Sequence, residues 1–144
     1  MAVAIDIGDP ANIHPANNQD VGARLALAAR KIAYEERDVE DAGPMFRSAT
    51  AEGHSLRVWF DHTTGGLAAK GESALAGFEV AGDDHHFMSA SAKIEANTVL
   101  VSCDGIAEPK YVRYGWADAP IVSLANGKGL PASPFTSEDQ IPQP

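Results

Sequence analysis

Residues 5–27, IDIGDPANIHPANNQDVGARLAL, place a turn, a histidine and the start of a helix in succession. The alternating apolar run before the Gly-Asp-Pro turn predicts a strand over residues 1–7. The proline after His14 favours an extended backbone there, and Asn17 or Asn18 suits the N-cap of a helix. We therefore predict a strand-loop-helix unit over residues 1–36, whose loop presents His14 to its surroundings.

The predicted helix covers residues 18–36, and one of its faces is apolar. That face carries residues at helical spacing: Val21, Leu25, Ala28 and Ile32. Arg24 and Arg30 lie off this face and are expected to stay in water. An amphipathic helix gains most of its stability from packing, and an unpaired strand needs a partner. We therefore expect the N-terminal strand and helix to be covered by self-association into a homo-oligomer, or by the rest of the chain.

A charged connector, residues 37–43, separates this unit from a region with a period of two. The strongest alternation is SLRVWFD at residues 55–61, and further short strands follow at about ten-residue spacing. The predicted fold class is mainly β: an antiparallel, Ig-like β-sandwich over residues 44–130 with the strand-loop-helix as an N-terminal appendage. Residues 131–144 contain four prolines and predict an extended tail.

Composition excludes several function classes. The 144 residues carry a net charge of −9, so no basic face is available for a nucleic acid. No apolar run reaches the roughly eighteen residues of a membrane span, and the N-terminus lacks the pattern of a signal peptide. The sequence therefore predicts neither a nucleic-acid nor a membrane partner, and it gives no localisation.

No cofactor or metal is predicted from the sequence. His85-His86 follows Asp83-Asp84, but neighbouring residues of a strand point to opposite faces, and acidic turns are usually solvated. Asp61-His62 ends a strong strand, where we interpret it as a strand-end cap. The Gly65-Gly66 loop lacks the strand-to-helix context of a phosphate-binding loop.

Three residues are candidates for sugar binding. Trp59, Tyr111 and Arg113 alternate out of the predicted core, and aromatic faces suit the C–H faces of sugars. Their competing interpretation is packing between strands or domains. Tyr114 and Trp116 share the other face of their strand, and we assign both to the core.

The 5–27 stretch resembles the last catalytic block of the sialate O-acetylesterase family, carbohydrate esterases of the SGNH-hydrolase type. In that family a D-I-H-P stretch carries the catalytic histidine, and an N-K-x-x-V-G-x-R-L-A-L helix follows it. Three downstream stretches resemble the family's C-terminal β-sandwich: GFEVAG at 77–82, VRYGWAD at 112–118 and NGKGLPASPF at 126–135. The resemblance covers nearly the whole chain, with its motifs in the family's order.

This resemblance implies roles for two residues. His14 matches the general base of a serine esterase, and Asp9 is the nearest carboxylate that could orient it. The sequence departs from the family at Ala11, three residues before the histidine, where an acid is usual, and at Asn12, where the family often has Asp. The serine and oxyanion blocks of the family do not occur in this sequence. The resemblance thus implies a C-terminal part of such an esterase, and the family is often secreted or periplasmic.

Three functions follow as hypotheses. The first is a non-catalytic accessory β-sandwich from an esterase whose partner is an acetylated carbohydrate or glycan. The second is a carbohydrate-binding module, which a cluster of exposed aromatic residues would favour. The third is a residual esterase that uses His14, which a nearby serine and paired backbone N–H groups would favour.

Overall fold

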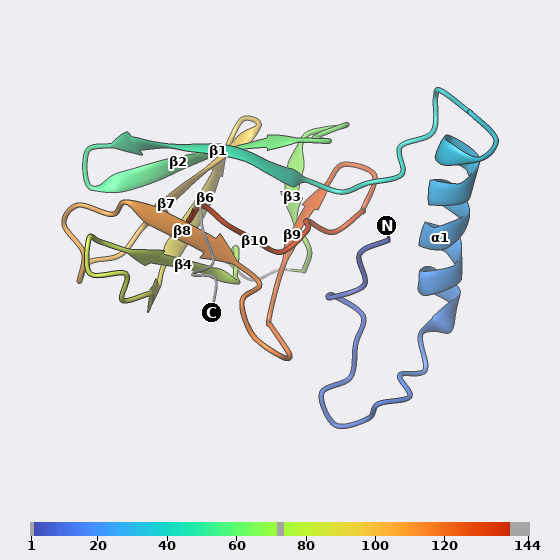
Figure 1. Cartoon of the computed structure of the whole chain (residues 1–144), viewed down its shortest axis with the longest axis horizontal. Coiled ribbons are helices and arrows are strands. Elements are labelled where there is room, and N and C mark those ends of the chain that lie inside the picture. Colours follow the sequence, from blue (N-terminus) through green and yellow to red (C-terminus); the bar gives the residue numbers. More distant parts are fainter. Residues whose placement is uncertain (1, 72–73, 139–144) are drawn as a thin grey trace.

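The structure, a computed structural model, describes residues 2–71 and 74–138 (Figure 1). The strands form two four-stranded antiparallel sheets, ordered β1-β2-β7-β6 and β10-β8-β4-β5, and a small β3-β9 pair. The elements are α1 (Asn18–Ile32), β1 (Met45–Glu52), β2 (Ser55–Asp61), β3 (Leu67–Ala69), β4 (Phe78–Ala81), β5 (Met88–Ser89), β6 (Ser91–Glu95), β7 (Thr98–Ser102), β8 (Tyr111–Tyr114), β9 (Leu124–Asn126) and β10 (Phe135–Thr136). The predicted mainly-β sandwich with an N-terminal helix is confirmed.

The two large sheets enclose one apolar core. On β2, Leu56, Val58 and Phe60 are buried while their neighbours face outward, as the alternation of residues 55–61 predicts. The inward residues of the other strands complete the core: Phe78, Val80, Val99, Val101, Val112 and Tyr114. Burial raises the pKa of the Tyr114 phenol to about 12, and the phenol oxygen accepts a hydrogen bond from Leu124 N at 3.0 Å.

The segment after residue 130 differs from the extended tail that the sequence predicts. β10 pairs with β8, and Phe135 is only 8% exposed. Its ring stacks on Phe46 with centroids 4.5 Å apart and also meets Phe60 edge-on at 5.8 Å. The sequence does not predict this strand, because a proline interrupts the alternation directly before Phe135. One large buried aromatic side chain is nevertheless enough to anchor a short edge strand.

The predicted N-terminal strand does not form. Within residues 2–17 the backbone is irregular, with a turn around residues 5–7, and Ile5 packs against the sandwich core as a single side chain. An isolated strand has no ladder to complete its hydrogen bonds, so the chain bends instead. The helix is also shorter than predicted, because α1 ends at Ile32 and the residues up to 36 turn away.

The face that the helix buries overlaps only in part with the predicted apolar face, through Ala28 and the half-buried Val21. Arg24 and Ala28 are buried, whereas Leu25 is 55% exposed and Ile32 is 68% exposed. Figure 1 shows the reason: α1 stands at one end of the sandwich, and the N-terminal segment runs between the helix and the strands. The helix therefore turns Arg24 toward that segment, where the ion pair described below satisfies its charge.

Asn126 joins the connector to the sandwich. Its side-chain nitrogen donates to the carbonyl oxygens of Ala42 and His62, both at 3.1 Å, and its side-chain oxygen accepts from the backbone N–H groups of Lys128 and Leu130. The side chain is 2% exposed, and these bonds satisfy its hydrogen-bonding groups. We call this arrangement the Asn126 junction.

One departure concerns a single position near the end of a strand. Trp116 was assigned to the core but is 47% exposed, because β8 ends at Tyr114 and Gly115 turns the chain with φ +64°. Gly43 is required where the connector passes the sandwich, since a Cβ there would lie 2.0 Å from the Pro131 carbonyl oxygen.

In the ranges that the structure describes, no helix is long and apolar enough to cross a membrane.

Candidate functional site

The His14 loop is built from short asparagine and aspartate turns. The Asp9 carboxylate accepts from the backbone N–H of Ala11 at 2.9 Å, and the Asn12 side-chain oxygen accepts from the backbone N–H of His14 at 2.9 Å. Each of these bonds fixes the backbone two residues on, as Asx turns do. The imidazole of His14 is exposed, so the loop holds the ring out from the molecule.

The helix that follows the loop begins as the sequence predicts. Asn17 is the N-cap, with its side-chain oxygen accepting from the backbone N–H of Asp20 at 3.2 Å. Its side-chain nitrogen donates to the Asp20 carboxylate at 2.9 Å, a second contact between the same two residues. The cap fixes the C-terminal end of the loop that carries His14.

Asp9 and His14 are not joined in this structure. Among the described residues, no hydrogen bond connects the Asp9 carboxylate with the His14 ring, and Asp9 is used by its own turn. Asn12 occupies the backbone N–H of His14 rather than its ring. The loop therefore presents the histidine alone.

A partly buried ion cluster holds the N-terminal segment against α1 and the sandwich. Both terminal nitrogens of Arg24 donate to the Asp6 carboxylate, at 2.6 and 3.0 Å, and Lys70 Nζ donates to the same carboxylate at 2.7 Å. Arg24 also donates to the Val3 carbonyl oxygen at 2.8 Å. The Asp6 side chain is 6% exposed. We call Asp6, Arg24 and Lys70 the Asp6 cluster; it links the N-terminal segment, α1 and the end of β3.

The Asp6 cluster changes the acidity of its carboxyl group. Burial alone would raise the pKa of Asp6, but the hydrogen bonds and charges of Arg24 and Lys70 outweigh burial, so the pKa lies below its usual value. Asp6 is therefore ionised at neutral pH, and a charge-assisted, bidentate pair fixes the angle of α1.

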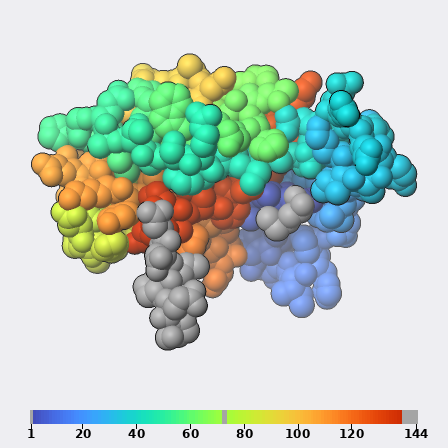
Figure 2. All heavy atoms as spheres, turned by 45° about the horizontal axis from the view of Figure 1, so that its top comes forward, coloured from blue at the N-terminus to red at the C-terminus, as the bar shows by residue number. Residues whose placement is uncertain are grey.

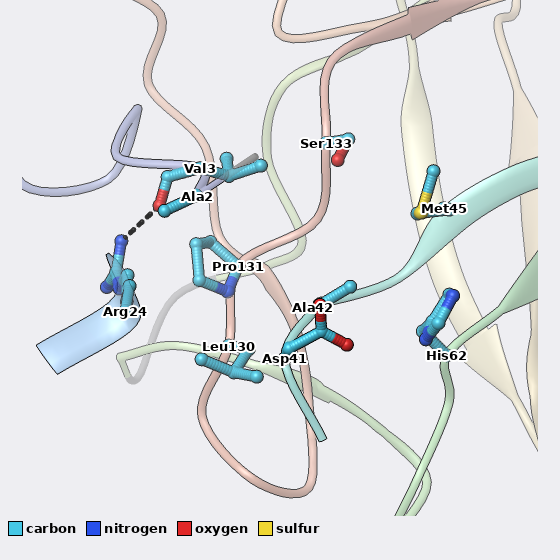
Figure 3. A pocket seen from close by; sticks show the side chains of 11 residues that line it. Ala2, Val3, Arg24, Asp41, Ala42, Met45, His62, Leu130, Pro131 and Ser133 are labelled. Carbon is cyan, nitrogen blue, oxygen red and sulfur yellow. Dashed lines mark hydrogen bonds between the residues drawn. The ribbon is translucent and has the colours of Figure 1, made fainter. Parts of the chain in front are cut away.

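A second arrangement surrounds a hollow of about 190 Å³ between the connector, the N-terminal segment and the end of β2 (Figure 3). His62 and Met45 lie on one side of it and Arg24 on the other. The Nδ1–H of His62 donates to Glu40 at 2.9 Å, and the hydroxyl of Thr64 donates to the same carboxylate. His62 has φ +58°, and its carbonyl oxygen accepts from Asn126.

Sequence reasoning missed this His62–Glu40 pair. It treated Glu40 as part of a solvated connector and Asp61-His62 as a strand-end cap. Burial alone would raise the pKa of Glu40. The hydrogen bonds from Thr64 and His62 outweigh burial and lower the pKa below its usual value, so the carboxyl group stays ionised. The pair fixes the connector against the sandwich, and no signal in the sequence places residues 40 and 62 together.

Two of the predicted sugar-binding residues already have partners. The Tyr111 ring stacks on His85 with centroids 4.3 Å apart and 25° between planes. The Arg113 guanidinium lies 4.1 Å from the centroid of the Phe87 ring and donates to Glu79 at 2.6 Å. These contacts cover one face of Tyr111 and the plane of Arg113.

Trp59 is placed differently. It lies on the outer face of the β1-β2-β7-β6 sheet and lines a groove together with Arg47, Arg57, Glu95, Asn97 and Thr98. Trp59 also has partners, since its indole N–H donates to the Thr50 hydroxyl and the Arg47 guanidinium lies over its ring. In the part of the chain that the structure describes, no three His, Cys, Asp or Glu side chains are grouped closely enough to hold a metal ion.

The chain is similar to a carbohydrate acetylesterase from Xanthomonas citri, whose crystal structure is known. The two share 43% sequence identity with a TM-score of 0.90, over 96% of this chain and 32% of that chain. This chain thus spans 32% of the length of the enzyme that it matches. No family model matches the chain, and no curated protein does. The likeness in both sequence and fold relates the chain to a carbohydrate esterase.

Proposed function

We propose that the chain is the C-terminal part of a carbohydrate esterase of the sialate O-acetylesterase type, and that by itself it is a non-catalytic accessory β-sandwich. One observation carries this proposal: 43% identity over 96% of this chain, but over only 32% of a carbohydrate acetylesterase. The motifs of the 5–27 stretch support the same assignment, because they resemble the last catalytic block of that esterase family.

The proposed role of His14 is general base for a serine outside this chain. The imidazole takes the proton from the serine hydroxyl while the serine oxygen bonds to the acetyl carbonyl carbon. The sugar oxygen then leaves and receives that proton from the imidazolium. Water repeats the two transfers, releasing acetate and the free serine. Exposure of the His14 ring on a loop with a fixed backbone supports this role.

Asp9 is the proposed orienting acid, and it would have to leave its present turn to serve. Its carboxylate now accepts from the Ala11 N–H at 2.9 Å, a local bond that a longer-range partner can replace. A single exposed bond to a neighbouring backbone group contributes only about 0.5–1.5 kcal/mol. The rest of the enzyme therefore has little to overcome in drawing Asp9 toward the His14 ring.

The isolated chain is proposed to be inactive because it presents the histidine alone. Preorganised oxyanion donors are usually the largest catalytic contribution, and loss of one donor costs about a hundredfold or more. The test is hydrolysis of p-nitrophenyl acetate by the chain and by its His14→Ala variant. We expect both to match buffer. Turnover that disappears with His14 would mean that the chain has a complete site of its own.

A chimera tests the role of His14 directly. This chain would replace the matching 32% of the Xanthomonas citri acetylesterase. We expect the chimera to hydrolyse p-nitrophenyl acetate, and its His14→Ala variant to lose about 10²–10⁴-fold in kcat. His86→Ala, at another exposed histidine, is the matched control and should change kcat by less than about twofold. Full activity in the His14→Ala chimera would overturn the assignment.

A further inference from the structure

The outer face of the β1-β2-β7-β6 sheet carries a groove of about 570 Å³. We call it the Trp59 groove. It lies between β2 and the turn that joins β6 to β7, and Figure 2 brings the β1 and β2 side of the molecule forward. Its volume falls within the range of about 300–1,000 Å³ that is usual for small-molecule sites. The groove lies on the sandwich, whereas α1 and the N-terminal segment stand at the end of the sandwich (Figure 1).

The sheet fixes the Trp59 ring in this groove. Trp59 pairs with Ser48 on β1 and with Thr98 on β7, so its side chain stands among neighbours on both sides. Its indole N–H donates to the Thr50 hydroxyl at 3.3 Å. A β-bulge in β1 between residues 46 and 48 places the Arg47 guanidinium 5.8 Å from the ring centroid. The ring is therefore a half-buried platform of fixed orientation.

The charges around the groove are already matched. Arg57 donates to Glu52 at 2.6 and 2.8 Å and to Glu95 at 3.1 Å, and Arg47 lies 3.5 Å from the Asp61 carboxylate. The hydrogen bonds from Arg57 lower the pKa of both glutamates, which keeps them ionised. An anionic ligand would therefore compete with carboxylates that are already present, whereas a neutral ligand meets no such opposition.

The turn between β6 and β7 supplies an uncommitted polar group. Asn97 is exposed, and its amide takes part in no hydrogen bond among the described residues. An amide both donates and accepts, so it can bind the paired hydroxyls of a sugar. Thr98, by contrast, is used: its hydroxyl accepts from Arg57 at 2.8 Å and donates to the Glu95 carbonyl oxygen at 2.7 Å.

We infer that the Trp59 groove binds a neutral glycan chain, with one sugar stacked on the Trp59 ring and its hydroxyls bound by Asn97. A sugar offers the two chemistries that the groove supplies: apolar C–H faces for an aromatic ring, and hydroxyls for planar polar side chains. The site is independent of His14. In an esterase that acts on acetylated sugars, it would hold the polysaccharide near the catalytic domain.

Tryptophan fluorescence tests this site, because the chain has only two tryptophans. In a Trp116→Phe variant, Trp59 is the only reporter. The probes are cellohexaose, xylohexaose and mannohexaose, with an α-2,8-linked trimer of N-acetylneuraminic acid as the anionic comparison. We expect at least one neutral hexasaccharide to change the emission saturably below about 10 mM, and the sialic acid trimer to bind more weakly.

Calorimetry with the best neutral probe assigns the residues. Trp59→Ala should weaken binding about tenfold or more, and Asn97→Ala should weaken it about threefold. Trp59→Phe keeps an aromatic ring and is less disruptive to the fold, so it should weaken binding less than Trp59→Ala does. Trp116→Ala, the exposed tryptophan elsewhere, should bind within about twofold of wild type. His14→Ala should also bind normally, which separates this site from the proposed esterase role.

Three results would overturn the inference. The first is that no neutral probe changes the fluorescence saturably. The second is that Trp59→Ala and Asn97→Ala leave the binding affinity unchanged. The third is that the sialic acid trimer binds more tightly than every neutral probe. None of them bears on the chimera experiment, whose readout is ester hydrolysis.

Discussion

The sandwich and the N-terminal unit, residues 2–36, are held in place by opposite means. Five valines of the sandwich are fully buried: Val58, Val80, Val99, Val101 and Val112. In the N-terminal unit, the buried residues of α1 are Arg24 and Ala28. Arg24 pairs with Asp6 inside the unit, and Lys70 of the sandwich pairs with the same Asp6 carboxylate. The sandwich is thus stabilised by apolar burial, which needs no partner, whereas the unit depends on a few directed polar contacts.

The difference also shows in what each region leaves exposed. Leu25 and Ile32 face outward from α1, and Ile13 of the His14 loop is 91% exposed. A contiguous apolar patch of several hundred Å² marks an interaction surface, whereas single exposed apolar side chains are common on protein surfaces. The N-terminal unit thus leaves large apolar side chains of its loop and helix in contact with water.

The largest expected effect is on the sandwich core. Phe78→Ala removes a ring that is 2% exposed and lies 4.7 Å from Tyr114, so we expect a loss of about 3–5 kcal/mol in the free energy of unfolding. Urea unfolding measures it. Ile121→Ala, at a residue that is 85% exposed, is the control and should change stability by less than about 0.5 kcal/mol. A loss below about 1 kcal/mol at Phe78 would contradict the account of the core.

A smaller and local effect is expected at the Asp6 cluster. Asp6→Asn leaves Arg24 buried without its carboxylate and should weaken the attachment of α1 by about 1.5–3 kcal/mol. Hydrogen exchange over residues 18–32 should become faster, while exchange in β2 and β7 stays the same. Asp38→Asn, in the exposed connector, is the matched control. Equal acceleration in both regions would mean that the two are one cooperative unit.

Acid should separate the two regions in the same way. The pKa of Asp6 is lower in the fold than its ordinary value of 3.8, so its contribution to stability is complete above that value. It is lost as the pH falls through the lower, folded-state pKa. We expect α1 to lose protection below about pH 4 while the sandwich keeps its near-ultraviolet circular dichroism. In Asp6→Asn this step should be absent; a step of the same size there would assign it to other carboxylates.

The smallest effect on stability is expected at the exposed face of α1. At dilutions where the chain is monomeric, Leu25→Gln should change the free energy of unfolding by less than about 0.5 kcal/mol. We propose that this face is covered by a second copy of the chain in solution, as the sequence predicts for the helix. Sedimentation velocity should then show a dimer for the wild type and a monomer for Leu25→Gln. Wild-type protein that is monomeric at 100 μM would overturn that proposal.

The sequence predicts those parts of the fold that depend on local alternation. Strand β2 is an example, because each side chain of residues 55–61 faces as its position in the alternation requires. Prediction from the sequence fails where residues far apart in the chain determine which side chains are buried. The inward turn of Arg24 is set by Asp6 and Lys70, and the burial of Phe135 is set by Phe46.

The candidate site shows the same division. The loop and its Asn17 cap are local, and the sequence predicts them well. The pairing of His62 with Glu40 joins two segments that no short-range pattern relates, and the stacking of Tyr111 on His85 is of the same kind. The roles of His14 and Asp9 stay predictions, since they depend on groups outside this chain.

The Asn126 junction has a consequence for the chemical ageing of the protein. Asn-Gly is the dipeptide in which the following backbone nitrogen most readily attacks the side-chain carbonyl carbon, and ring closure and hydrolysis then convert the asparagine to aspartate or isoaspartate. In this fold the Gly127 nitrogen donates to the Gly66 carbonyl oxygen at 2.8 Å, and the Asn126 amide is held by its own bonds. Ring closure therefore requires the junction to open, so the rate at which isoaspartate accumulates at this position reports how often the junction opens.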